Sequence, residues 1–92
     1  MHLTLVGASF RARADKDILR ASSMGQELTL VPDPENAYDP TAVKVLIDEA
    51  HVGFLPRNDA PRIFHALMGG DEVSAVIVAF ESALRPVMEI EL

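Results

Sequence analysis

The stretch from Leu30 to Pro56 constrains the fold of this chain more than any other part of the sequence. It holds an apolar run, a turn-rich segment with two prolines, and two further strand-like runs separated only by Asp48-Glu49-Ala50. Proline presets a backbone angle, and Asn or Asp side chains bond to nearby backbone, so such segments form fixed turns. Alternating runs joined by a tight turn predict a β-hairpin. We therefore expect antiparallel sheet here, with a rigid polar loop before it.

The same patterns predict six strands along the chain. They are expected at residues 2–8, 26–31, 41–47, 51–55, 73–80 and 87–92. The run Val73 to Phe80 is so apolar that we expect a strand buried on nearly both faces. Phe64 and Phe80 are expected in the core.

Two segments carry helical features. Asp15 to Ser23 is interpreted as a short helix or turn. The stronger helix follows Asn58 and Asp59, either of which can cap it, has Pro61 in its first turn, and ends at Gly69-Gly70. Short strands, hairpin turns and one good helix predict a mainly β fold, either a small antiparallel barrel or a compact α+β domain.

Length and composition set limits on the class of protein. With 92 residues the chain has room for one domain, expected at 1–92. A hydrophobic content of 49% favours a folded chain, and the absence of cysteine excludes disulfides and thiolate metal sites. No apolar run approaches the ~18 residues of a membrane helix. No secretory signal pattern opens the sequence, so we expect a cytoplasmic protein without membrane contact.

Catalytic and cofactor-binding patterns are missing from the sequence. Gly7-Ala8-Ser9-Phe10-Arg11 has arginine where a nucleophile elbow needs its second glycine. There is no glycine-rich phosphate loop ending in Lys-Ser/Thr, and the three histidines lack the spacing of a metal site. We therefore expect a binding protein that is not an enzyme and holds no metal or cofactor.

Three of the five aromatic residues are candidates for ligand contact. Tyr38 lies in a polar loop and is expected to be exposed, whereas both exposure and burial remain open for Phe10. For Phe54 a core position and a position in a groove both remain open. Exposed rings beside arginine suit the stacking of unpaired bases, which contributes ~1–3 kcal/mol per base.

The central motif resembles that of a known family. Asp33 to Val45 reads D-P-x-N-x-Y-D-x-x-A-V-x-V, and Val52 to Pro56 reads V-G-F-L-P. Both resemble the HIRAN domain, a module found on DNA-remodelling ATPases and helicases and also alone in bacteria and phages. The opening Leu5 to Arg11, the entry Gly25 to Leu30 and the close Arg85 to Ile90 resemble the family in the same order.

The resemblance implies a six-stranded, OB-like barrel that binds single-stranded DNA and captures its 3′ end, in DNA repair or replication-fork processing. On that basis Asp39 accepts a hydrogen bond from the 3′-hydroxyl, and Asn36 orients it or bonds the sugar-phosphate. For both residues an Asx turn that only shapes the loop also remains open. Tyr38 belongs to the same loop. The further expected contacts are two aromatic residues and two arginines: Phe10, Phe54, Arg11 and Arg57.

Charge and two departures from the family leave a second class open. The chain carries a net charge of −6, and basic patches usually provide affinity for nucleic acid. Ser9 stands where DNA-binding relatives have arginine, and Arg11 replaces an aromatic residue. The alternative is a protein-interaction or structural domain that uses an edge such as Val87–Leu92. We expect a monomer or weak homodimer, fused to or associated with a helicase- or nuclease-type enzyme that supplements weak DNA binding.

Overall fold

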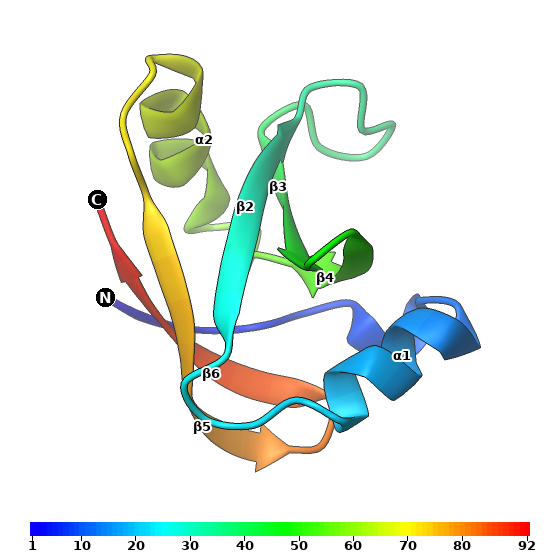
Figure 1. Cartoon of the computed structure of the whole chain (residues 1–92). Coiled ribbons are helices and arrows are strands. Elements are labelled where there is room, and N and C mark those ends of the chain that lie inside the picture. The colour runs from blue at the N-terminus through cyan, green and yellow to red at the C-terminus, as the bar shows by residue number, and fades with distance from the viewer.

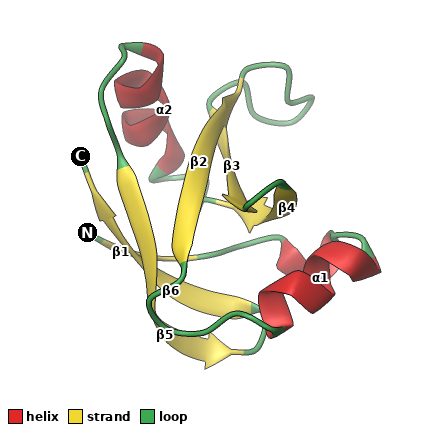
Figure 2. Cartoon of the chain, viewed as in Figure 1, coloured by secondary structure: helices red, strands yellow, loops and turns green.

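Short strands and helices alternate along the chain in a computed structural model that describes residues 1–92 (Figure 1, Figure 2). The elements in chain order are β1 His2–Thr4, the 3-10 helix η1 Ala8–Phe10, α1 Arg13–Arg20, β2 Glu27–Asp33, β3 Ala42–Ile47, β4 Ala50–Phe54, α2 Ala60–Met68, β5 Ser74–Ser82 and β6 Arg85–Glu91. All six predicted strands are present, in the predicted order.

The strands form one antiparallel sheet that curls toward closure. Their order is β1-β6-β5-β2-β3-β4, so β1 and β4 are its two ends. The segment after β1 meets the end of β4 through two hydrogen bonds: Val6 N to the Phe54 carbonyl at 3.0 Å and Phe54 N to the Val6 carbonyl at 2.9 Å. The sheet is not fully closed, but it is barrel-like, which agrees with the predicted OB-like architecture.

The first strand is shorter than predicted. A strand was expected over residues 2–8, but β1 ends at Thr4. Gly7 then adopts a left-handed conformation with φ of 77°, which reverses the chain and starts η1. Phe10 therefore lies in a 3-10 turn and not at the end of a strand.

Gly53 is packed against the segment that joins β1 to η1. A Cβ atom at this position would lie 2.7 Å from the Val6 carbonyl oxygen and 2.8 Å from Leu5 Cγ. No real side chain fits at those distances, so the absence of a side chain lets the two ends of the sheet meet.

The expected burial of the fifth strand is wrong. Only Ala75 and Ile77 of β5 are buried, while Val78 and Phe80 are each 37% exposed. The cause is its pairing: β2 accompanies β5 only near Ala75 and Val76, so the far half of β5 pairs with β6 alone. Phe80 is consequently not a core residue. Figure 1 shows the β5–β6 hairpin extending below the rest of the sheet.

The predicted free edge at the C-terminal strand is also wrong. β6 lies between β1 and β5, and residues 85–91 are paired on both sides for most of their length. Leu5 N adds a hydrogen bond to the Pro86 carbonyl at 3.0 Å. The backbone of this strand is therefore not available to a partner strand.

Both helices occur where the sequence predicted helical segments. The segment expected as a short helix or turn at 15–23 overlaps α1, which begins two residues earlier and ends three residues earlier, and which buries a single residue, Leu19. α2 begins after Asp59 and ends at Gly69, as expected, but the Asp59 side chain makes no capping hydrogen bond. Neither helix is long and apolar enough to cross a membrane.

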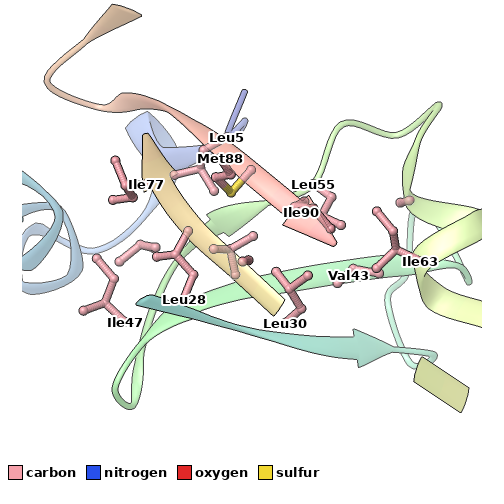
Figure 3. Packing of buried hydrophobic residues seen from close by; sticks show 14 of the residues in the cluster. Leu5, Leu28, Leu30, Val43, Ile47, Leu55, Ile63, Ile77, Met88 and Ile90 are labelled. Atoms are coloured by element: carbon pink, nitrogen blue, oxygen red, sulfur yellow. The ribbon is translucent and has the colours of Figure 1, made fainter. Parts of the chain in front are cut away.

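The core lies between the curled sheet and α2. Its 17 residues are all apolar, and no polar or charged residue is buried. Figure 3 shows side chains from opposite strands, including Leu5, Leu30 and Met88, converging with Ile63 of α2. This packing holds the strand ends that carry the candidate site.

We predict that Gly53→Ala destabilises the fold by about 1–3 kcal/mol, because its methyl group would overlap Leu5 and the Val6 carbonyl. Urea unfolding followed by circular dichroism measures the change. Gly69→Ala is the control, because Gly69 has an ordinary φ of −79° and its closest added contact is 3.3 Å. Equal stability of the two variants would contradict the close packing described here.

Candidate functional site

The loop between β2 and β3 is shaped by Asn36. Its side-chain oxygen accepts hydrogen bonds from the backbone N–H groups of Tyr38 at 2.9 Å and Asp39 at 3.0 Å. Its amide nitrogen donates to the Asp33 carboxylate at 3.1 Å. These bonds form an Asx turn. Asn36 is thus a brace that fixes the positions of its neighbours.

Asp39 has one engaged and one open carboxylate oxygen. Oδ1 accepts hydrogen bonds from the Thr41 backbone N–H at 3.0 Å and the Thr41 hydroxyl at 2.9 Å. Oδ2 makes no hydrogen bond and lies 4.0 Å from Arg57 Nε. The two bonds from Thr41, and to a smaller degree Arg57, hold the pKa of Asp39 below its ordinary value of 3.8. The carboxylate is therefore charged at neutral pH, and Oδ2 is free to accept a hydrogen bond.

Arg57 links the far side of the hollow to the loop. Its terminal nitrogen donates to the Tyr38 carbonyl at 3.2 Å, while its side chain remains 75% exposed. The Tyr38 ring itself is 87% exposed, as predicted. A free aromatic face and a weakly held guanidinium therefore stand beside the charged oxygen of Asp39.

Phe54 forms the wall opposite the loop. Its backbone is held by Val6, and its partly buried ring packs edge-on against the half-buried ring of His51, with 4.7 Å between ring centres. His51 Nε2 lies 2.9 Å from the Gly53 carbonyl. Burial, reinforced by the Arg11 charge, holds the pKa of His51 below its ordinary value, so the ring is neutral at pH 7. Of the two positions that the sequence left open for Phe54, the one in a groove is observed, because Phe54 lines the hollow and is not among the buried core residues.

These groups surround an open hollow of about 240 Å³. Its lining consists of Val6, Asn36, Tyr38, Asp39, Ala42, Phe54, Leu55 and Arg57. The structure therefore brings together five of the seven predicted site residues, from two separate parts of the chain.

Phe10 lies outside this hollow, on an adjacent one. Its ring is 91% exposed, and it lines a second hollow together with Ser9, Leu84 and Arg85. The two hollows share Val6 in their linings. Of the alternatives that the sequence left open for Phe10, exposure is the one observed.

Arg11 is placed differently from its predicted role as a phosphate contact. Its Nε donates to the His51 carbonyl at 2.8 Å, and its terminal nitrogen bonds to Asp15 at 3.2 Å. The guanidinium is thus engaged between α1 and β4, and it does not line the hollow. By bonding to Asp15 of α1 and to the His51 carbonyl of β4, it holds α1 on the sheet.

Four residues of the site were not singled out by the sequence. Val6, Ala42 and Leu55 give the hollow its apolar floor, and Thr41 holds Asp39. Ala42 and Leu55 belong to the motifs quoted above, and a threonine two residues after an aspartate is a common local hydrogen-bond partner. Val6 lies in the opening segment quoted above, but nothing local marks it for the site, because only its pairing with Phe54 brings it there.

The arrangement suits a ligand with an apolar or aromatic body, a hydroxyl donor and a nearby anion. The hollow can hold the apolar or aromatic part of the ligand. Asp39 Oδ2 can accept a hydrogen bond from its hydroxyl group, and Arg57 can attract its anionic group. No group of three or more His, Cys, Asp or Glu side chains is arranged to hold a metal ion. The fold and site therefore define a small barrel-like binding domain with its pocket between the β2–β3 loop and the end of β4.

Comparison with known families gives this class a name. The profile of the HIRAN domain matches residues 2–90, and the chain belongs to this family. No curated protein shows significant similarity to the sequence.

Two solved structures share the fold. The crystal structure of the HIRAN domain of human HLTF superimposes with a TM-score of 0.80 at 18% identity, covering 98% of this chain and 71% of that one. A protein from Lactobacillus plantarum superimposes with a TM-score of 0.86 at 16% identity, covering 97% and 87%. At such low identity these matches establish the fold.

We predict that Thr41→Val raises the pKa of Asp39 part of the way toward 3.8, because the hydroxyl donor is removed and the backbone donor remains. The lowered pKa means that Asp39 contributes stability above its ordinary pKa and loses it as pH falls through the lowered value. The substitution should therefore shift that loss to higher pH. Carbon-detected NMR titration of the Asp39 carboxyl measures the pKa. Thr41→Ser keeps the hydroxyl and should leave it unchanged, and an unchanged pKa in Thr41→Val would refute the assignment.

Proposed function

We propose that this domain is a non-catalytic nucleic-acid-binding module that recognises the 3′ end of single-stranded DNA. The observation that carries the proposal is the geometry at Asp39, a residue that lines the hollow: one carboxylate oxygen accepts two hydrogen bonds from Thr41, and the other accepts none. A carboxylate is a poor neighbour for phosphate but a good acceptor for a terminal hydroxyl. It therefore favours a strand that ends in 3′-OH over one that continues or carries a 3′-phosphate.

The surrounding groups fit the other parts of such a strand. The exposed rings of Tyr38 and Phe10 suit base stacking, and Arg57 suits the last phosphate. Phe54 and the apolar floor pack against the terminal sugar, and Asn36 keeps the loop in shape. Arg11 is left out of the direct contacts because its guanidinium is bound to His51 and Asp15.

The rival proposal, a protein-interaction or structural domain, has less support. It required Tyr38 and Phe10 to pack onto the barrel and β6 to offer a free edge. Both rings are exposed, and β6 is an inner strand. The net charge of −6 still predicts weak binding by the domain alone, micromolar or weaker. A fused or associated helicase- or nuclease-type enzyme would then provide the remaining affinity.

The proposal predicts that a short DNA oligonucleotide with a 3′-OH binds about tenfold or more tightly than the same oligonucleotide with a 3′-phosphate. The reason is a hydrogen bond from the 3′-OH to a charged oxygen, which the phosphorylated end cannot form and replaces with charge repulsion. Fluorescence anisotropy at low salt measures both affinities. Equal binding of the two oligonucleotides would sink the end-recognition mechanism.

Two substitutions separate the contributions of the site. Asp39→Asn should abolish the preference for 3′-OH, while Glu72→Gln, an equal charge change at an exposed position outside the hollow, should preserve it. Tyr38→Ala should weaken the binding of both oligonucleotides about five- to a hundredfold, because one base loses a stacking partner that contributes ~1–3 kcal/mol. If neither oligonucleotide binds to any form of the protein, nucleic-acid binding itself is refuted.

A further inference from the structure

The positive charge of this acidic chain is concentrated on α1 and the turn before it. The chain has eight Lys and Arg residues, and half of them lie between Arg11 and Arg20. Arg13, Lys16 and Arg20 follow one another at intervals of three and four residues, so they line one side of the helix. We call these three residues the α1 stripe. Arg13 and Arg20 are exposed, and Lys16 is half-buried.

The α1 stripe is poorly neutralised by the protein. A single carboxylate, Asp17, lies 3.0 Å from Arg20 and 3.9 Å from Arg13, and Lys16 has no ion-pair partner. The Arg13 side chain is 92% exposed and that of Asp17 is 59% exposed. Exposed ion pairs of this kind contribute little to stability, so a phosphate can replace Asp17 at small cost. The stripe therefore carries an available positive charge.

The fold itself does not require this charge. α1 buries only Leu19, and Arg11 ties the start of the helix to β4. The remaining side chains of α1 face solvent or lie at its margin. An eight-residue helix that adds one side chain to the core presents mainly a charged outer surface.

The helix that carries the α1 stripe is next to elements that form the proposed site. α1 packs on β4, whose end carries Phe54, and the exposed Phe10 comes three residues before the helix. Figure 1 shows α1 and the β2–β3 loop on the same side of the molecule, with the β3–β4 hairpin between them. Asp71, Glu72 and Glu91 instead line a separate hollow near α2 and the C-terminus. A strand leaving the pocket over Phe10 thus meets cations on α1 and avoids this acidic region.

We propose that the DNA strand whose 3′ end occupies the pocket continues along α1, where Arg13, Lys16 and Arg20 contact the phosphates of nucleotides farther from the end. This inference rests on the proposed function and extends its site. Arg13 and Arg20 are about 10 Å apart along the helix axis at ~1.5 Å per residue, enough to face more than one phosphate. The phosphates compete with Asp17 for the two arginines.

The test compares a dinucleotide with an oligonucleotide of about ten nucleotides, within the site size of an OB fold, both ending in 3′-OH. The wild-type domain should bind the longer one more tightly. The triple variant Arg13→Gln, Lys16→Gln, Arg20→Gln should bind the longer strand about tenfold or more weakly and keep its affinity for the dinucleotide. Its salt dependence should become shallower by ~0.7 for each phosphate that is no longer neutralised. An unchanged affinity for the longer strand would overturn the inference.

A gain-of-function variant tests the same surface while all three cations stay in place. Asp17→Asn should raise the affinity for the longer strand several-fold and leave the dinucleotide unaffected, because it frees Arg13 and Arg20. Glu72→Gln, which removes one exposed carboxylate away from α1 and the pocket, is the control for net charge and should have no length-dependent effect. Unchanged affinity in Asp17→Asn would count against the α1 stripe.

The outcomes also distinguish the strand path along α1 from recognition of the 3′ end at the pocket. A preserved preference for 3′-OH with no effect of length leaves the proposed function standing and refutes the path along α1. If the wild-type protein shows no preference for a 3′-OH, end recognition at the pocket is refuted. Absence of binding by both strands refutes both.

Discussion

The pairing of Val6 with Phe54 is the contact on which the site depends. Two hydrogen bonds join segments from the two ends of the sheet and curl it into its barrel-like shape. Gly53 makes the approach possible, because any side chain there would overlap the Val6 carbonyl and Leu5. The same contact makes Val6 and Phe54 neighbours in the pocket wall. Closure of the fold and formation of the site are therefore one structural event.

The polar half of the site depends on local hydrogen bonds. Asn36 and Thr41 each satisfy backbone or side-chain groups within three residues, and together they leave Asp39 with a single open oxygen. Because Thr41 already bonds to Oδ1 in the free protein, the Asp39 carboxylate is held in position before a ligand binds. Preorganisation of this kind reduces the cost of association. It also explains how an acidic domain can present a carboxylate at a site proposed for DNA.

Much of this arrangement was readable from the sequence where the determinants are local. The hairpin around Asp48, the polar loop with exposed Tyr38, and α2 with Pro61 in its first turn all depend on residues close in the chain. The errors occur where distant segments decide. The length of β1 depends on how the chain turns at Gly7 to meet β4, and the exposure of Phe80 depends on where β2 leaves β5. Arg11 bonds to the His51 carbonyl, a partner forty residues away that its own neighbours could not indicate.

The pairing of β1 with β6 has a consequence for how the domain assembles. His2 pairs with Glu89, so this ladder joins nearly the two extremes of the chain, whereas β3 and β4 pair across a tight turn. Contacts between distant residues bear a larger loop-closure cost and tend to form late. β1 is also only three residues long, and none of the three is fully buried. We therefore expect the N-terminal segment to dock last and to detach first. Because Val6 belongs to this segment and lines the pocket, the pocket should open before the rest of the sheet does.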